Sequence, residues 1–286
     1  MSFGQTIVLG ALAGFTIYLG LPVGRLRLLS SRTRVALAMF AVGILAFILV
    51  DVLSHGSGIL ETALERYKAG KASFGHMAGL VGLLAGGFTL GAAGLGILER
   101  RLRPAPLPPP AAGGSQAAVI DADDAARLGE QTDLARRRAL QTGLVIATAI
   151  GLHNFAEGLA IGVSARAGAV TLATVLIIGF ALHNATEGFG IIGPLGAVRP
   201  SWRWLMLVGL IGGGPTFIGS MVGYAVTSTP LELCFYALAG GAILYVIGEI
   251  WHGIRRYGHR ELGLLLLACG FIAGVLTDLI VAYGGG

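Results

Sequence analysis

The sequence predicts an all-α integral membrane protein with eight transmembrane helices. Hydrophobic residues make up 55% of the chain and charged residues only 12%, whereas soluble domains carry about 25% charged residues. This composition excludes a large water-soluble enzyme, and the high apolar content excludes a disordered chain. The 47 glycines suit tightly packed membrane helices, in which small residues let backbones approach closely.

Eight apolar segments reach the ~20 residues that a helix needs to cross a bilayer. They cover residues 4–24, 35–54, 75–98, 139–163, 169–192, 203–227, 232–253 and 262–283. We expect the first segment to be a span rather than a cleaved signal peptide, because no Lys or Arg precedes Arg25. Cys234 and Cys269 lie in apolar stretches and predict neither a disulfide framework nor a Cys-based zinc site.

The basic residues divide unequally between the two sides that these spans define. Sixteen of the 20 lie in the alternate connections 25–34, 100–138, 199–203 and 255–260. The other four are Arg66, Lys68, Lys71 and Arg166. The positive-inside rule places the sixteen in the cytoplasm and both termini outside. The net charge of +5 therefore reflects orientation, and we expect no nucleic-acid partner.

The chain divides at one long connection. Residues 1–100 hold the first three spans, and residues 101–138 form a flexible cytoplasmic loop that is rich in Pro, Ala and Gly before it becomes charged. A short helix is expected at the end of this loop. Residues 139–192 hold spans four and five, and residues 193–286 hold the last three.

Internal similarity predicts an inverted repeat in a 3 + 2 + 3 arrangement. LLAGGFTLG (83–91) in span three matches LLACGFIAG (266–274) in span eight at six of nine positions. Spans two and seven share an Ile-Leu pair followed by an acidic residue and His-Gly, and spans four and five share Leu-His-Asn-x-x-Glu-Gly. The matched spans run in opposite directions. Such repeats are the architecture of secondary transporters, although a duplicated structural protein is the alternative.

The motif in spans four and five carries metal-binding groups. His153 and Glu157 are four residues apart, as are His183 and Glu187, so each pair lies on one helix face. Two such helices side by side present two imidazoles and two carboxylates, which suffice for tetrahedral zinc. An ionised carboxylate near a membrane-helix centre costs about 2.5–3.5 kcal/mol, so two of them at mid-span predict a function.

Two asparagines accompany these ligands. Asn154 and Asn184 are turned by about 100° from the histidines on their helices. They can form the edge of a second, neighbouring site that the two glutamates bridge.

The motifs HNFAEG and HNATEG in the fourth and fifth of eight spans resemble the signature of the ZIP (Zrt/Irt-like protein) family of divalent metal transporters. The expected outside termini, long cytoplasmic loop and 3 + 2 + 3 arrangement are also similar to that family. The resemblance covers essentially the whole chain. It implies a primary metal site with the ligands His153, Glu157, His183 and Glu187.

The resemblance also implies a second site that includes Asn154 and Asn184. This chain departs from the family pattern there. Many members have an acidic residue where this chain has Asn184, and some carry a Glu-Pro pair in the sixth span, where this chain offers only Thr216 nearby. We therefore expect one well-held ion.

These features predict transport of a divalent transition metal ion towards the cytoplasm by alternating access. Zn²⁺ is the first expectation, with Cd²⁺, Fe²⁺ and Mn²⁺ as alternatives, because His and carboxylate ligands serve all of them. The resemblance implies an elevator-like motion. We expect the metal ion and the lipid bilayer as partners, a bacterial inner membrane as the location, and no cofactor or catalytic residues; a homodimer is left open.

Two rival functions use the same residues. A membrane metalloenzyme of the hydrolase or di-iron type would bind metal through such a cluster, but the chain has His-x-x-x-Glu rather than HExxH or Glu-x-x-His. A proton-coupled carrier of an organic solute would need a roomier polar pocket than the Ala/Gly/Leu-rich surroundings indicate.

Other polar residues lie towards the ends of the predicted spans. One set either reaches out to water or lines the metal path: Asp51, His55, Glu249 and His252. A second set is expected to be structural or interfacial: His76 and Asp278.

Overall fold

The computed structural model describes residues 1–26, 30–102, 122–166, 168, 170–196, 198–225 and 228–283, with side chains left undescribed at 102, 122–128, 170–176, 182 and 281–282. The helices are α1 (Phe3–Phe15), α2 (Ile17–Gly20), η1 (Leu21–Arg25), α3 (Ser31–Lys68), α4 (Phe74–Leu102), α5 (Ala122–Arg166), α6 (Val170–Ile192), η2 (Gly193–Leu195), α7 (Trp202–Ala225), α8 (Thr229–Ile254), η3 (Arg255–Tyr257) and α9 (Arg260–Tyr283).

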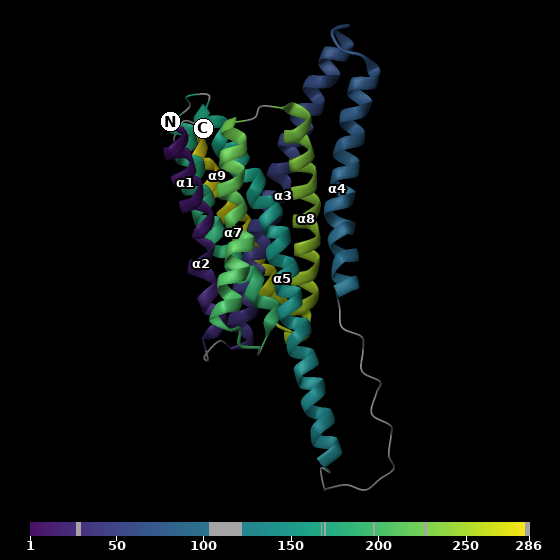
Figure 1. Ribbon diagram of the computed structural model, residues 1–286, viewed down its shortest axis with the longest axis vertical. Coiled ribbons are helices and arrows are strands. Elements are labelled where there is room, and N and C mark those ends of the chain that lie inside the picture. The colour runs from purple at the N-terminus through teal and green to yellow at the C-terminus, as the bar shows by residue number, and fades with distance from the viewer. Residues whose placement is uncertain are drawn as a thin grey trace.

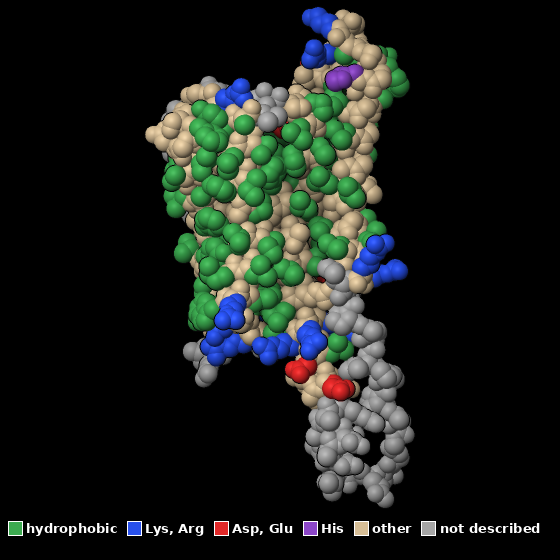
Figure 2. Space-filling model, in the orientation of Figure 1, with side chains coloured by type: hydrophobic (Ala, Val, Ile, Leu, Met, Phe, Trp, Pro, Cys, Tyr) green, Lys and Arg blue, Asp and Glu red, His purple; other side chains and the backbone are tan. Residues whose placement is uncertain are grey.

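The all-α membrane fold is confirmed. Within the described residues, seven helical segments are long and apolar enough to cross a membrane, and α6, with 23 residues, forms the remaining predicted span. Both chain termini lie at the same end of the bundle (Figure 1). Figure 2 shows a band of hydrophobic side chains with Lys and Arg gathered along its lower edge and at the tip of the α3–α4 hairpin.

The first predicted span is a broken helix. Helix α1 ends at Phe15, α2 starts at Ile17, and Thr16 lies between them. The Thr16 hydroxyl donates to Ala13 O at 2.6 Å, which competes with the helical hydrogen bonds of that turn. Pro22, in the first turn of η1, has no N–H to continue an α-helical ladder.

Two helices are longer than the bilayer requires, and both replace predicted loop with helix. Helix α3 has 38 residues, about 57 Å at 1.5 Å per residue, and rises with α4 beyond the other helices (Figure 1). It continues past residue 54 because Ile59, Leu60 and Ala63 belong to a small hydrophobic cluster with residues of α4 and α8.

Helix α5 has 45 residues and starts at Ala122. Residues 122–138, expected mainly as loop with a short helix at its end, instead continue the span as one helix, since Ala, Leu, Arg, Glu and Gln favour helix. The rest of the expected loop, from residue 103 to 121, lies outside the described residues.

Close glycine contacts divide the helices into two groups. A Cβ on Gly158 of α5 would lie 2.8 Å from Ser220 N of α7, and one on Gly188 of α6 would lie 2.8 Å from Leu21 N. Together with the contacts of Gly14 in α1 with Gly213 of α7 and of Gly20 in α2 with Ala185 of α6, these contacts join α1, α2, α5, α6 and α7 into a first group. A Cβ on Gly91 of α4 would lie 3.0 Å from Ala242 N of α8.

Equivalent contacts join α3 to α9 and complete a second group of α3, α4, α8 and α9. Between the groups, the nearest atoms to the interface glycines are side-chain atoms, as for Gly190 with Ile250 and Gly193 with Ala38. The first and sixth spans therefore pack with spans four and five. Glycine permits this grouping, because it lets α1, α5 and α7 meet backbone to backbone.

The packing follows the predicted inverted repeat. Helix α3 packs on α9 as α8 packs on α4, and α6 contacts α9 as α5 contacts α4. The large apolar core lies where the groups meet and includes Ile146, Ile150, Ile191 and Ile250, each at most 1% exposed. These residues lie towards the end of the bundle that carries the basic edge.

Candidate metal centre

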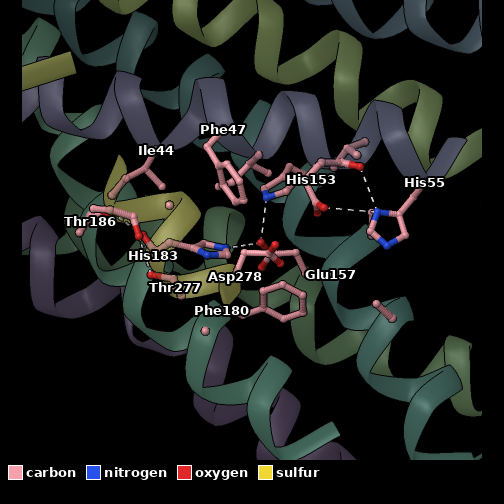
Figure 3. Close-up of a pocket in the computed structure, with 18 of the residues that line it drawn as sticks. Ile44, Phe47, His55, His153, Glu157, Phe180, His183, Thr186, Thr277 and Asp278 are labelled. Atoms are coloured by element: carbon pink, nitrogen blue, oxygen red, sulfur yellow. Dashed lines mark hydrogen bonds and ion pairs between the residues drawn. The ribbon is translucent and has the colours of Figure 1, made fainter. Parts of the chain in front are cut away.

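Three side chains that the motif predicts converge where α5 and α6 lie side by side. Glu157 Oε1 lies 2.8 Å from His153 Nε2, and the same oxygen pairs with His183 Nε2. Figure 3 shows both imidazoles directed at this carboxylate. Ligand atoms of His153, Glu157 and His183 all lie within 4.8 Å of one another, so one ion can contact all three.

The local sequence explains this arrangement. His153 and Glu157 are one helical turn apart on α5, and α6 runs alongside and brings His183 to the same level. The side chains of His153 and Glu157 are 1% and 4% exposed, and that of His183 is 13% exposed. The Phe180 ring packs against the His183 imidazole at a centroid distance of 5.4 Å, so an apolar side chain covers part of this ring. Buried ionisable groups need partners, and here they supply each other.

Glu187 occupies a different position from the one expected for a fourth ligand. It is 1% exposed, but its Oε2 accepts a hydrogen bond from Asn154 Nδ2 at 3.1 Å, and it is not part of the three-residue cluster. The structure therefore brings three of the four expected ligands together and holds the fourth beside them.

Both asparagines use their amide groups to tie helices together. Asn154 Nδ2 also donates to Gly212 O of α7 at 3.0 Å. Asn184 Nδ2 donates to Ala13 O, beside the break between α1 and α2, at 3.2 Å. The two side chains are completely buried.

A cavity of about 450 Å³ reaches the cluster from the side of α3 and α9. Its walls include Asp51, His55, Thr277 and Asp278, together with apolar residues such as Phe47 (Figure 3). His55 Nδ1 lies 3.5 Å from Asp51 Oδ1, and both side chains are well exposed. The exposed side chains of Asp51 and His55 therefore line the same cavity as the buried imidazoles of the cluster.

Sequence reasoning missed part of this wall. Asp278 was expected to be structural or interfacial, but it lines the cavity with Gly274 and Thr277. The signal was present, because residues 274, 277 and 278 have the i, i+3, i+4 spacing of one helix face. Asp51 and His55 also line the cavity, whereas Glu249 and His252 are not among its lining residues. His76 is exposed on α4.

Comparison with known proteins gives concordant matches. Residues 114–247 match the family model described as ZIP Zinc transporter. A protein of Clostridium perfringens (strain 13 / Type A) named zinc transporter ZupT is 26% identical over 155 residues, which are 52% of this chain and 54% of the relative. A protein of the same name from Akkermansia muciniphila is 26% identical over 149 residues, 50% of this chain and 53% of the relative. The chain thus spans about half the length of the curated relatives it matches.

Proposed function

We propose that the chain, which matches the ZIP Zinc transporter family model over residues 114–247 and two curated zinc transporters at 26% identity, is a ZIP-family transporter that carries divalent transition metal ions, zinc foremost, across a membrane. The convergence of two imidazoles and one carboxylate inside the helix bundle carries this proposal. The two relatives named as zinc transporters support zinc as the cargo.

The cluster binds the metal as substrate. The ion takes one Nε2 from each of His153 and His183 and an oxygen from Glu157, all of which are common zinc ligands. Both imidazoles must be neutral and the carboxylate ionised, so that binding displaces protons. Glu187 completes four-coordination through its Oε1, which has no partner among the described residues, while its Oε2 keeps the hydrogen bond from Asn154.

The cavity supplies the entrance. Asp51 and Asp278 place carboxylates in its wall, and His55 lies beside Asp51. Negative charge at the mouth raises the local concentration of cations. An ion that loses water there moves on to the imidazoles through the cavity, whose walls include Phe47 and Phe180.

The distribution of basic residues supports an orientation of the chain in the membrane, and the proposed direction of transport rests on that orientation. The positive-inside rule assigns the basic edge of the bundle to the cytoplasm, which leaves both termini outside and opens the cavity towards the exterior. The isoleucine core closes the cytoplasmic half. We therefore propose uptake towards the cytoplasm through a bacterial inner membrane.

Alternating access then requires the first helix group to move against the second. Side chains rather than backbones meet across this interface, which favours sliding of whole groups. His153, Glu157 and His183 all belong to the first group and would travel with it, in the elevator-like manner that the family resemblance implies.

The test is zinc flux into liposomes that contain the purified chain and a zinc-sensitive dye. We expect Glu157→Gln and His183→Ala to lower the initial rate at least about 10-fold, because each removes a metal ligand. His76→Ala, which removes an exposed histidine outside the cluster, should leave the rate unchanged. Equal flux in both cluster variants and the unmodified chain would reject the site. Hydrolytic or oxidative turnover without flux would favour a metalloenzyme.

A further inference from the structure

The turn that follows α6 is held by two arginines from the second helix group. This turn is η2 (Gly193–Leu195), with Gly196 directly after it. Arg256 Nη2 of η3, which continues α8, donates to Pro194 O at 3.1 Å. Arg34 Nη1 of α3 donates to Gly196 O. Helix α6 belongs to the first group and both arginines to the second, so these bonds cross the interface between the groups.

The sequence of the turn calls for such donors. The last carbonyls of a helix have no partner within it, and Pro194 has no N–H with which to extend the helix. An arginine near a helix carboxyl end donates to these carbonyls and balances their partial negative charge. Gly196 has a φ of +61°, which favours glycine, and a Cβ there would lie 2.7 Å from Arg256 Nη2. Glycine therefore lets the guanidinium reach the turn.

Close packing surrounds the two bonds at the end of the bundle away from the cavity mouth. A Cβ on Gly193 would lie 2.9 Å from Cβ of Ala38 in α3. Along α3, Arg34 and Ala38 precede Phe40, the first residue of that helix to line the cavity, and the exposed His55 lies farther along the same helix. The arginines therefore hold the closed end of the interface, where the isoleucine core also lies.

We propose that Arg34 and Arg256 form a latch that holds α6 against the second group and stabilises the state in which the cavity is open. The inference rests on the proposed function for the motion of the first group. That motion must break both bonds, because their donors and acceptors belong to different groups. Hydrogen bonds from a charged donor are stronger than neutral ones, so the latch biases the equilibrium between the two access states without touching the metal cluster.

Thiol labelling of two reporters tests the latch. Both native cysteines, Cys234 and Cys269, are first replaced by serine. Ala273→Cys places a thiol in the cavity wall. Ala41→Cys places one on α3 at the closed interface, because Ala41 is 1% exposed and its Cβ would lie 4.0 Å from a Cβ on Gly190 of α6. A charged methanethiosulfonate reagent should reach the first thiol in the open-cavity state and the second only when the groups separate there.

The full chain is labelled in lipid nanodiscs without metal. We expect the double variant Arg34→Gln/Arg256→Gln to speed labelling at residue 41 by roughly 3–10-fold, since charge-assisted bonds lose part of their strength where water reaches them. Labelling at residue 273 should not become faster. The double variant Arg34→Lys/Arg256→Lys keeps both charges and should give intermediate rates at residue 41.

The matched control is Arg32→Gln/Arg255→Gln, which removes the same charge from two exposed neighbours that do not donate to η2. It should label like the unmodified background. If the double glutamine variant does not fold, Arg256→Gln alone decides the matter, because this side chain is exposed and exposed substitutions are usually tolerated. It should also speed labelling at residue 41.

An unchanged rate at residue 41 would overturn the latch. Equal acceleration at residues 41 and 273 would also overturn it, because general loosening of the bundle would then account for the effect. Zinc flux into liposomes, measured on the unmodified chain, reports the proposed function separately. Faster labelling at residue 41 in a chain that moves no zinc would contradict the proposed function and leave the latch standing, whereas zinc flux with unchanged labelling would contradict the latch alone.

Discussion

A methyl group added at Gly158 probes the packing that holds α5, the helix of the proposed ligands His153 and Glu157, in place. An ideal Cβ at this position would lie 2.8 Å from Ser220 N and 2.9 Å from Gly219 Cα, closer than the 3.4 Å at which ordinary contact begins, and closer still to Thr216 O. All three atoms are backbone of α7, so no side chain can rotate away. Helices α5 and α7 must separate by more than half an ångström.

Overpacking of this kind costs about 1–3 kcal/mol. For a chain of this size, each 1 kcal/mol corresponds to about 2–4 °C in Tm, so we expect Gly158→Ala to lower the Tm by roughly 2–12 °C. Zinc affinity should also fall, because Glu157 is the adjacent residue. Tryptophan fluorescence during thermal unfolding, followed by zinc titration, measures both effects.

The matched control is Gly86→Ala on α4, where an added Cβ would meet nothing within 4 Å. Alanine is favoured over glycine in a helix by about 0.5–1 kcal/mol, so this variant should be as stable as the unmodified chain or more so. Equal Tm values for Gly158→Ala and Gly86→Ala would refute the assignment of α5 and α7 to one closely packed group.

Three further predictions concern binding. Zinc affinity should fall as the pH is lowered from about 7.5 to 5.5, because protons compete for the two imidazoles and Glu157; a pH-independent dissociation constant in zinc titrations would count against these ligands. Asn154→Leu should lower zinc affinity by about 10–100-fold, since it removes the donor that positions Glu187. An unchanged affinity in isothermal titration calorimetry would show that Glu187 is held by other means. Asp278→Asn should raise the KM for zinc uptake several-fold while leaving the equilibrium affinity of the cluster unchanged, and flux assays at low and saturating zinc separate the two effects.

The sequence determined the class of the protein and most of the residues that the proposed metal site contains. Apolar length specified the spans, because a bilayer admits only backbones that satisfy their own hydrogen bonds. The four-residue spacing of His153 and Glu157 specified a shared helix face, and the repeat of that motif placed His183 opposite them. Helical spacing and the length of an apolar segment depend only on residues close together in the sequence, so they do not depend on how the helices pack.

Only the tertiary structure decided how the helices group and what Glu187 contacts. His183 and Glu187 have the same four-residue spacing. Glu187 nevertheless accepts a hydrogen bond from Asn154, while the His183 imidazole pairs with Glu157 of α5. Glycines fixed this outcome by letting α5 meet α7 and α6 meet α2 at backbone distance. Likewise, Asp278 joined the cavity wall because α9 packs on α3. A periodic pattern defines a face of one helix, whereas the neighbour that covers this face depends on how closely every pair of helices in the bundle can approach.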